Sequence, residues 1–171
     1  LAREYKLRII LSGAAEGWRV AQEIAAAKVP VLLNPTFNLP SRYEALGATL
    51  QNAALLDEAG VEVAIVGNDP GHRVRDMRYN AGVAVSRGLP YLAAIEAITL
   101  APARIFGVAD QVGSLEAGKQ ADVVLWSGDP LEPLTQPVMV FIGGEEQPMR
   151  SRSLDLRDRY SPKPRGEMPS S

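Results

Sequence analysis

The sequence contains no cysteine. Without a thiol the chain forms no disulfide, gives a metal no thiolate ligand and has no cysteine nucleophile, although this absence leaves the compartment open. Histidine is almost as rare, since His72 is the sole example among 171 residues. Chemistry that needs several histidines therefore cannot come from this chain alone.

Aromatic residues and surplus charge are also scarce. Tryptophan, tyrosine and phenylalanine make up 6% of the residues, and 18 basic against 20 acidic side chains give a formal net charge of −2. Nucleic acids and anionic membranes attract proteins through a surplus of basic groups, which this composition lacks. No basic stretch alternates with aromatics, and no apolar run approaches the roughly 20 residues that cross a bilayer. We therefore expect neither a nucleic acid nor a membrane as partner.

What is present is typical of a globular protein. Hydrophobic residues amount to 46% and charged residues to 22%, close to the average of soluble domains. The length suits one domain, or one domain with a small appendage. The chain starts at Leu1-Ala-Arg3 without an initiator methionine or a signal-peptide pattern. We therefore expect that it begins inside a longer protein, and its localisation stays unknown.

Strand and helix patterns alternate over the first part of the chain. Short buried or β-type runs predict three strands, at residues 6–11, 29–33 and 61–66. Apolar residues at helical spacing predict helices between them, at 14–27 and 48–59. Connections this short favour parallel pairing, so the alternation predicts an α/β fold. Three further helices are expected at 77–87, 90–99 and 102–106.

Beyond residue 110 the pattern changes to turns and short β-type runs. A strand is predicted at 121–126, with Asp122 as a turn or cap acceptor, and a hairpin at 138–147. Charges and prolines dominate the end of the chain, where a helical patch is expected at 154–160. We therefore expect a larger unit, a smaller β-rich unit and a tail, with bounds at 1–110, 111–150 and 151–171.

Two loops follow predicted strands, and α/β proteins of the barrel kind place catalytic groups just past the carboxyl ends of strands. The loop 34–47 starts at Asn34, which we predict to contact substrate, although a surface excursion around a neighbouring element explains such a loop equally well. The loop after residue 66 holds Asp69 as a candidate catalytic carboxylate. His72 and Arg73 in the same loop are candidate substrate contacts, because guanidinium binds carboxylate bidentately. Two alternatives explain these residues equally well: His72 is a loop histidine without a functional role, and Arg73 is a solvent-exposed arginine.

Two motifs follow these loops. The first is Ala97-Ile-Thr-Leu-Ala-Pro-Ala-Arg-Ile-Phe-Gly-Val-Ala-Asp110, and the second is Val112-Gly-Ser-Leu-Glu-Ala-Gly-Lys-Gln-Ala-Asp-Val-Val-Leu-Trp126. Both resemble the C-terminal part of amidohydrolase-superfamily enzymes, with the imidazolonepropionase-like branch as the nearest match. The family's closing strand pair is similar to Val138-Met-Val-Phe-Ile-Gly-Gly-Glu145. The match covers about a third of the chain.

The resemblance implies the last three strands and helices of a (β/α)8 TIM-type barrel, followed by strands of a small β-sandwich. It also implies a metal-dependent hydrolase that acts on non-peptide C–N bonds of a small amide-type substrate. In the family, an aspartate after strand eight accepts the proton of the metal-bound water, and Gly67-Asn-Asp69 occupies that place here. Asp69 is thus the implied general base and a candidate metal ligand; a turn aspartate before Pro70-Gly71 is the alternative.

The sequence also departs from the family. Metal-binding members carry a histidine after strand six, where this chain has Ser12-Gly-Ala-Ala-Glu16, and the other ligands implied by the family would lie before Leu1. A catalytic zinc site usually takes three protein ligands. We therefore expect a divalent cation, Zn²⁺ by resemblance, only if upstream ligands are present, and none for this chain alone. Glu16 is a weaker candidate for an oxygen ligand of the metal or a pocket-lining residue, because a glutamate near a helix start commonly interacts with the helix dipole.

Three functional interpretations stay open. The chain is part of an amidohydrolase-like enzyme, or a non-catalytic relative with a degenerate metal site that serves binding or assembly, or a half-barrel that pairs with another chain. The last interpretation follows from the bare sheet edges of half a barrel, which invite pairing. We therefore expect self-association or pairing with the rest of the barrel.

Overall fold

The structure, a computed structural model, describes residues 2–41, 43–67, 76–150 and 152–161. Its first sheet has the order β1-β2-β3, with strands Leu11–Ser12, Val31–Leu33 and Val63–Ile65. Both strand pairs are parallel, and the register places Leu11 opposite Val31 and Leu33 opposite Ile65. The predicted parallel α/β arrangement is therefore confirmed for this part of the chain.

Helices connect and cover these strands. A short helix, α1 (Ala2–Tyr5), comes before β1, and a 3-10 turn, η1 (Gly17–Val20), leads into α2 (Ala21–Ala26) between β1 and β2. Two further 3-10 turns and α3 (Asn52–Glu58) lie between β2 and β3; the turns are η2 (Pro35–Phe37) and η3 (Tyr43–Ala45). Three helices follow the sheet: α4 (Met77–Ser86), α5 (Tyr91–Ile98) and α6 (Leu100–Phe106).

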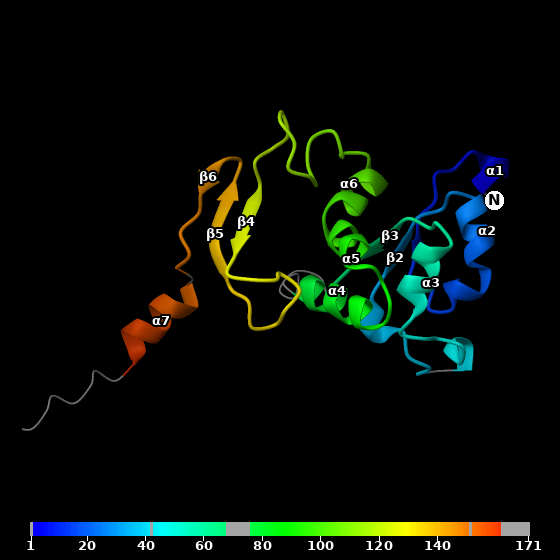
Figure 1. Cartoon of the computed structure of the whole chain (residues 1–171), viewed down its shortest axis with the longest axis horizontal. Helices are drawn as coiled ribbons and strands as arrows, with labels where there is room; N and C mark the ends of the chain where they lie inside the picture. The colour runs from blue at the N-terminus through cyan, green and yellow to red at the C-terminus, as the bar shows by residue number, and fades with distance from the viewer. Residues whose placement is uncertain (1, 42, 68–75, 151, 162–171) are drawn as a thin grey trace, which may run out of the picture.

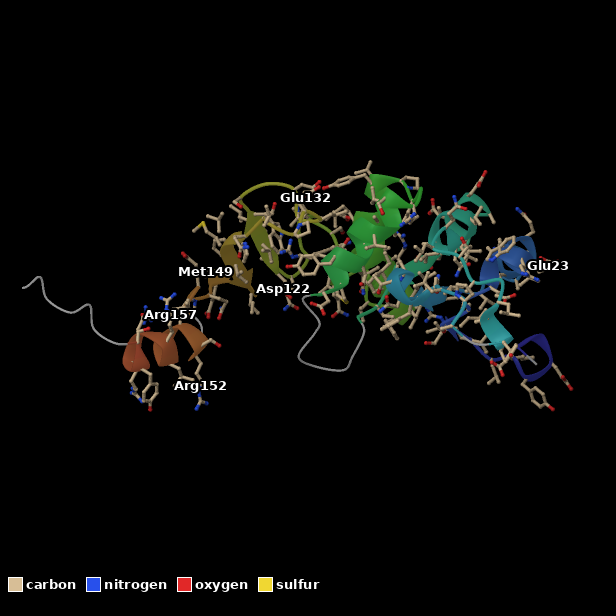
Figure 2. All side chains as sticks on the ribbon, turned by 90° about the horizontal axis from the view of Figure 1, so that it is seen from below. Glu23, Asp122, Glu132, Met149, Arg152 and Arg157 are labelled. Carbon is tan, nitrogen blue, oxygen red and sulfur yellow. The ribbon has the colours of Figure 1, made fainter. Side chains whose placement is uncertain are left out.

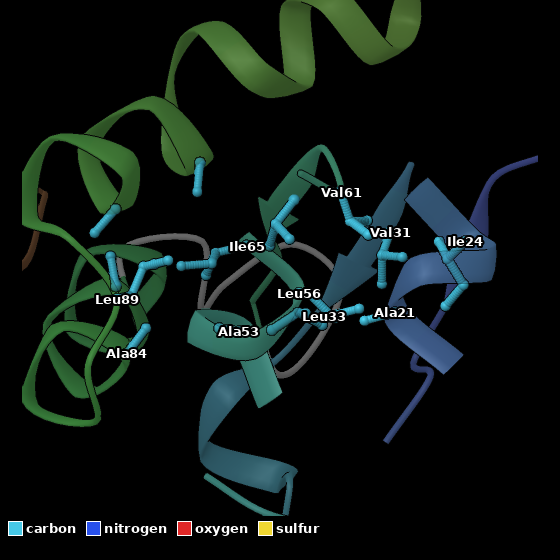
Figure 3. Close-up of a cluster of buried hydrophobic side chains, with 14 of the residues drawn as sticks. Ala21, Ile24, Val31, Leu33, Ala53, Leu56, Val61, Ile65, Ala84 and Leu89 are labelled. Carbon is cyan, nitrogen blue, oxygen red and sulfur yellow. The ribbon is translucent and has the colours of Figure 1, made fainter. Parts of the chain in front are cut away.

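The core lies between the sheet and these helices. Figure 3 shows Ala21 and Ile24 of α2 beside Val31, with Leu56 of α3 next to Leu33. Val31, Leu33 and Leu56 are completely buried. Full burial of a side chain of this size contributes roughly 1.5–3 kcal/mol to folding. The apolar spacing that predicted the helices therefore marks their inward faces.

A second sheet follows α6. Strands β4 (Val123–Trp126), β5 (Pro137–Ile142) and β6 (Glu145–Glu146) form an antiparallel sheet of that order, which Figure 1 shows beside α4 to α6. The turn Gly143-Gly144 joins β5 to β6, so the predicted hairpin is confirmed. The last helix, α7 (Arg152–Tyr160), carries Arg152 and Arg157 away from both sheets (Figure 2). No helix in the described ranges is long and apolar enough to cross a bilayer.

The prediction for the first strand is wrong in its position. Residues 2–5 are helical, Lys6 has a φ of 51°, and pairing begins only at Leu11. Leu7 is 56% exposed, so it does not enter the core. A strand extends only as far as its partner pairs with it, and β2 offers three residues. The bounds of the larger and smaller units, at 110 and 150, stay predictions.

Candidate functional site

The carboxyl ends of β1, β2 and β3 meet at one edge of the first sheet, because all three strands are parallel. The ladder continues past the strands, since the amide of Gly13 donates to the Leu32 carbonyl at 2.8 Å. The amide of Val66 likewise donates to the Leu33 carbonyl at 3.0 Å. Ligands of open α/β sheets bind at this edge, which is where the sequence predicted the site.

Three of the predicted site residues, Asp69, His72 and Arg73, lie outside the described residues. The described chain reaches Gly67 at the carboxyl end of β3 and resumes at Asp76, directly before α4. The described residue before the segment that carries Asp69 is therefore at the expected edge. The roles of these three residues stay predictions.

Asn34 follows β2 and shapes the start of the next loop. Its Oδ1 accepts a hydrogen bond from the Thr36 amide at 3.1 Å and from the Thr36 hydroxyl at 2.6 Å. The side chain thereby caps the 3-10 turn η2, in which Pro35 occupies an early position. Asn34 lies at the predicted edge, and its contact with substrate stays a prediction.

Asn80 is a site residue that the sequence interpretation missed. It lies on α4, is 2% exposed, and its Nδ2 donates to the Val66 carbonyl at 3.0 Å. Its Oδ1 lies 3.3 Å from the Thr36 hydroxyl. That hydroxyl has one hydrogen, so the shorter bond to Asn34 takes most of it. The sequence does contain a signal for Asn80, because asparagine is unfavourable inside a helix and needs hydrogen-bond partners when it is buried there.

Glu16 holds the far end of the loop 34–47. Its Oε1 accepts a hydrogen bond from the Gly47 amide at 2.7 Å, and its Oε2 lies 3.0 Å from Nε of Arg19. The Trp18 indole donates to the Gly47 carbonyl at 2.8 Å. Glu16 is the N-cap residue of η1 but makes no side-chain capping bond to it. Its observed contacts instead tie the loop to the chain after β1.

The described residues do not make a metal centre on their own. Within the ranges given above, no group of three or more histidine, cysteine, aspartate or glutamate side chains lies together as a metal site needs. Asn34, Thr36 and Asn80 offer only neutral oxygen atoms at the sheet edge, and the Glu16 carboxylate already binds Gly47 and Arg19. These groups do not fit the donor set of a catalytic zinc ion.

Two further residues from the sequence can now be placed. Arg78 lies on α4, and its guanidinium donates to the carbonyls of Pro130 at 2.9 Å and Glu132 at 2.8 Å. It therefore joins α4 to the loop before β5. Asp122 accepts from the Gly143 amide at 2.7 Å, which confirms its predicted role in a turn.

Comparison with known proteins agrees with this architecture. A model of the "Amidohydrolase family" matches residues 10–147. The chain is 31% identical over 131 residues to "Amidohydrolase tasK" of Hapsidospora irregularis, covering 70% of this chain and 13% of that protein. It is 34% identical over 116 residues to "Imidazolonepropionase" of Micrococcus luteus, covering 66% of this chain and 28% of that protein.

A solved structure gives the same result. The amidohydrolase from Thermotoga maritima superposes with a TM-score of 0.78 at 28% identity, covering 85% of this chain and 38% of that one. The chain therefore spans well under half the length of each of these proteins. The extent of the family match decides the assignment: this chain belongs to the amidohydrolase family.

Proposed function

We propose that the protein hydrolyses a C–N bond of a small amide-type substrate, and that this chain supplies strands six to eight of a (β/α)8 barrel. The family match over residues 10–147 supports the reaction class. The three parallel strands with their connecting helices support the place in the barrel. The β4 to β6 sheet would then be part of the small β-sandwich that follows the barrel.

The observation that carries this proposal is the ordered polar edge that leads into the Asp69 segment. Val66 directly follows β3, and both its amide and its carbonyl are bonded, to Leu33 and to Asn80. Asp69 comes three residues later in the sequence. A general base must lie within hydrogen-bond distance of the proton that it removes. A carboxylate that follows a fixed strand end closely in the sequence suits this role.

Asp69 would act on the attacking water. The carboxylate takes a proton from the water while the water oxygen attacks the carbonyl carbon of the amide. The C–N bond then breaks, and the nitrogen leaves with a proton returned by the carboxylic acid. His72, Arg73 and Asn34 are proposed to contact the substrate from the same edge.

A divalent cation, Zn²⁺ by family resemblance, is proposed only as a partner of residues outside the described ranges. When bound, such an ion lowers the pKa of a coordinated water. The described side chains do not match the donor set of such an ion. The steps above are therefore written without it and use only residues of this chain.

We also propose that this chain packs against further barrel strands, either of its own protein or of a second copy. In the described part of the first sheet, β1 and β3 each pair on one side only. The β4 to β5 ribbon also exposes apolar side chains, since Val138 and Ile142 are each 55% exposed. An exposed strand edge beside apolar surface invites association. Size-exclusion chromatography with light scattering tests this, and a stable monomer of this chain would contradict it.

The reaction class is tested by incubating the intact natural protein with cyclic and linear amides and following release of the amine or acid. Turnover of at least one amide class is expected. A folded protein of full natural length that hydrolyses none of them would contradict the proposal and favour the non-catalytic interpretation.

A further inference from the structure

We propose that α7 of one copy of the protein docks into a cavity beside β4 of a second copy, and that two copies exchange this helix reciprocally. The inference goes beyond the proposed function and does not depend on the reaction. Two complementary features of the described chain support it. One is a basic helix that stands apart from both sheets (Figure 1), and the other is an apolar cavity in an acidic unit.

The helix α7 is too short to be stable without a partner. It has nine residues, and none of them is buried. Isolated helices shorter than about 12–15 residues are marginal in water, and most helices in proteins are stabilised by packing an apolar face. Leu156 and Tyr160 are both exposed, and because they are four positions apart they lie on one face of α7. This apolar face is the part of the helix that a partner would cover.

The charges of α7 divide between two faces. Both of its aspartates form ion pairs, with Arg150 just before the helix and with Arg157. The other two arginines of the helix, Arg152 and Arg159, form no ion pair within the part of the chain that the structure describes. They are seven positions apart, on the face that carries Leu156. Figure 2 shows Arg152 and Arg157 on opposite sides of the helix. Two unpaired cations therefore flank the apolar face.

The receiving site is an apolar cavity between α5 and β4. Its volume is about 640 Å³, and its lining includes Ile95 and Ile98 of α5 and Val124 and Trp126 of β4. Val124 is 41% exposed, so the cavity opens to the surface. A space of this size is large enough for the side chains of a leucine and a tyrosine. Removing exposed apolar surface from water on both partners favours association.

The unit that contains the cavity has the charge opposite to that of the α7 face. Residues 111–149 include a single basic side chain, Lys119, which already pairs with an acidic neighbour. Their six acidic side chains are Glu116, Asp122, Asp129, Glu132, Glu145 and Glu146. Asp122 lines the cavity itself. Arg78 of α4 also lines it, but its guanidinium already donates to backbone carbonyls. Complementary charge of this kind steers encounter and sets orientation.

The occupant is a second copy because the helix and the cavity lie on different sides of the second sheet. The chain enters α7 after β6, and β4 is the strand farthest from β6 in the order β4-β5-β6. Figure 1 places β4 toward α5 and α6, and α7 beyond β5 and β6. A helix that leaves its own unit in this direction meets the matching surface on another molecule. Reciprocal exchange gives a closed dimer with two identical contacts.

Engineered cysteines test the contact, since this chain has none of its own. One preparation of the intact protein carries Leu156→Cys and another carries Val124→Cys, with any cysteine outside this chain replaced by serine. The two are mixed under mild oxidation, and a disulfide forms only where the Cα atoms come within about 7 Å. We expect cross-linked pairs of chains. Leu125→Cys is the matched control, because Leu125 is equally exposed but faces the other side of β4. Its yield should be lower by about tenfold or more.

The arginines provide a second measurement. Arg159→Gln in the Leu156→Cys preparation should lower the cross-linking yield about threefold or more, because a cation that faces the acidic unit is lost. Arg157→Gln removes the same charge from the opposite face and should leave the yield within about 1.5-fold of its starting value. Raising the ionic strength from about 0.05 M to about 0.5 M should also lower the yield, because salt screens exposed charges.

Three results would overturn the inference. The first is no cross-link between Leu156→Cys and Val124→Cys chains. The second is an equal yield with Leu125→Cys, because the helix would then contact the sheet without entering the cavity. The third is a cross-link within one chain of a protein with both cysteines, undiminished by excess natural protein, because α7 would then dock on its own unit. Association through strand edges alone would give dimers without this disulfide and would equally contradict the exchange of α7.

Discussion

The guanidinium carbon of Arg78 lies 5.0 Å from the centre of the Trp126 ring and 4.2 Å from that of Tyr79. The contact joins α4, beside the first sheet, to β4 of the second sheet. The same guanidinium donates to backbone carbonyls of the loop before β5, among them those of Pro130 and Glu132. A planar cation with five donors is suited to stacking and carbonyl binding at once.

Replacing Arg78 with methionine should therefore weaken the junction between the two sheets. We expect the free energy of unfolding to fall by about 2 kcal/mol, because several carbonyls lose a charged donor and two rings lose a cation. Urea unfolding followed by tryptophan fluorescence measures this. Arg87→Met is the matched control, since Arg87 is exposed at the end of the same helix. Equal losses in both variants would show that Arg78 has no special role.

Two glycines of the second sequence motif should differ in their tolerance of alanine. Gly113 has a φ of +98°, and an added Cβ would lie 2.8 Å from the Ala103 Cβ and 3.1 Å from the Leu100 Cα. Gly118 has a φ of +91°, with no described atom within 4 Å of its added Cβ. Gly118→Ala should cost about 1 kcal/mol in stability for backbone strain. Gly113→Ala should cost at least about 1 kcal/mol more for overpacking, as measured by thermal unfolding.

Asn38, in the loop after β2, should be replaceable with a gain in stability. It is 3% exposed, and the nitrogen of its side-chain amide, Nδ2, has no hydrogen-bond partner among the described atoms. An unpaired buried donor costs about 1–3 kcal/mol, so Asn38→Leu is expected to stabilise the fold by about 1 kcal/mol. Asn52→Leu should destabilise it, because there the amide is paired. Destabilisation by both changes would contradict this account of Asn38.

Asp57 should make stability depend on pH. Burial, and next the nearby Glu96 carboxylate, raise the pKa of Asp57 in the folded protein. Ionised Asp57 is therefore disfavoured by folding, and stability falls as pH rises from about 4 through the raised pKa. Asp57→Asn should then stabilise the protein near pH 7 and have little effect near about pH 3. Chemical unfolding at both pH values, with Glu58→Gln as an exposed neighbouring control, measures the difference.

Much of the fold could be predicted because its signals are local. Gly88 and Pro90 separate α4 from α5, and Gly107 has the positive φ that ends α6. The extent of β1 could not be predicted, because it depends on pairing with β2, twenty residues away. The predicted helix 14–27 likewise begins as a 3-10 turn at Gly17, since Glu16 is bonded to the distant Gly47.

The place of the candidate site could be predicted, but its contacts could not. Asn34 was predicted at this edge because it follows a strand, and that position depends on sequence order alone. Asn80 was missed because its partner, the Val66 carbonyl, lies 14 residues earlier and carries no side-chain signature. The sequence shows only that Asn80 is a polar residue within a mostly apolar helix. This pattern indicates that the side chain is buried, but it does not identify the hydrogen-bond partner.

The most direct test of the central claim is kcat of Asp69→Asn in the intact protein, compared with Asp110→Asn on the same amide. Asp110 is exposed after α6, and the same chemical change there should leave kcat unchanged. Loss of a general base is expected to lower kcat by about 100-fold or more. An Asp69→Asn protein that hydrolyses the amide as fast as Asp110→Asn would contradict the account.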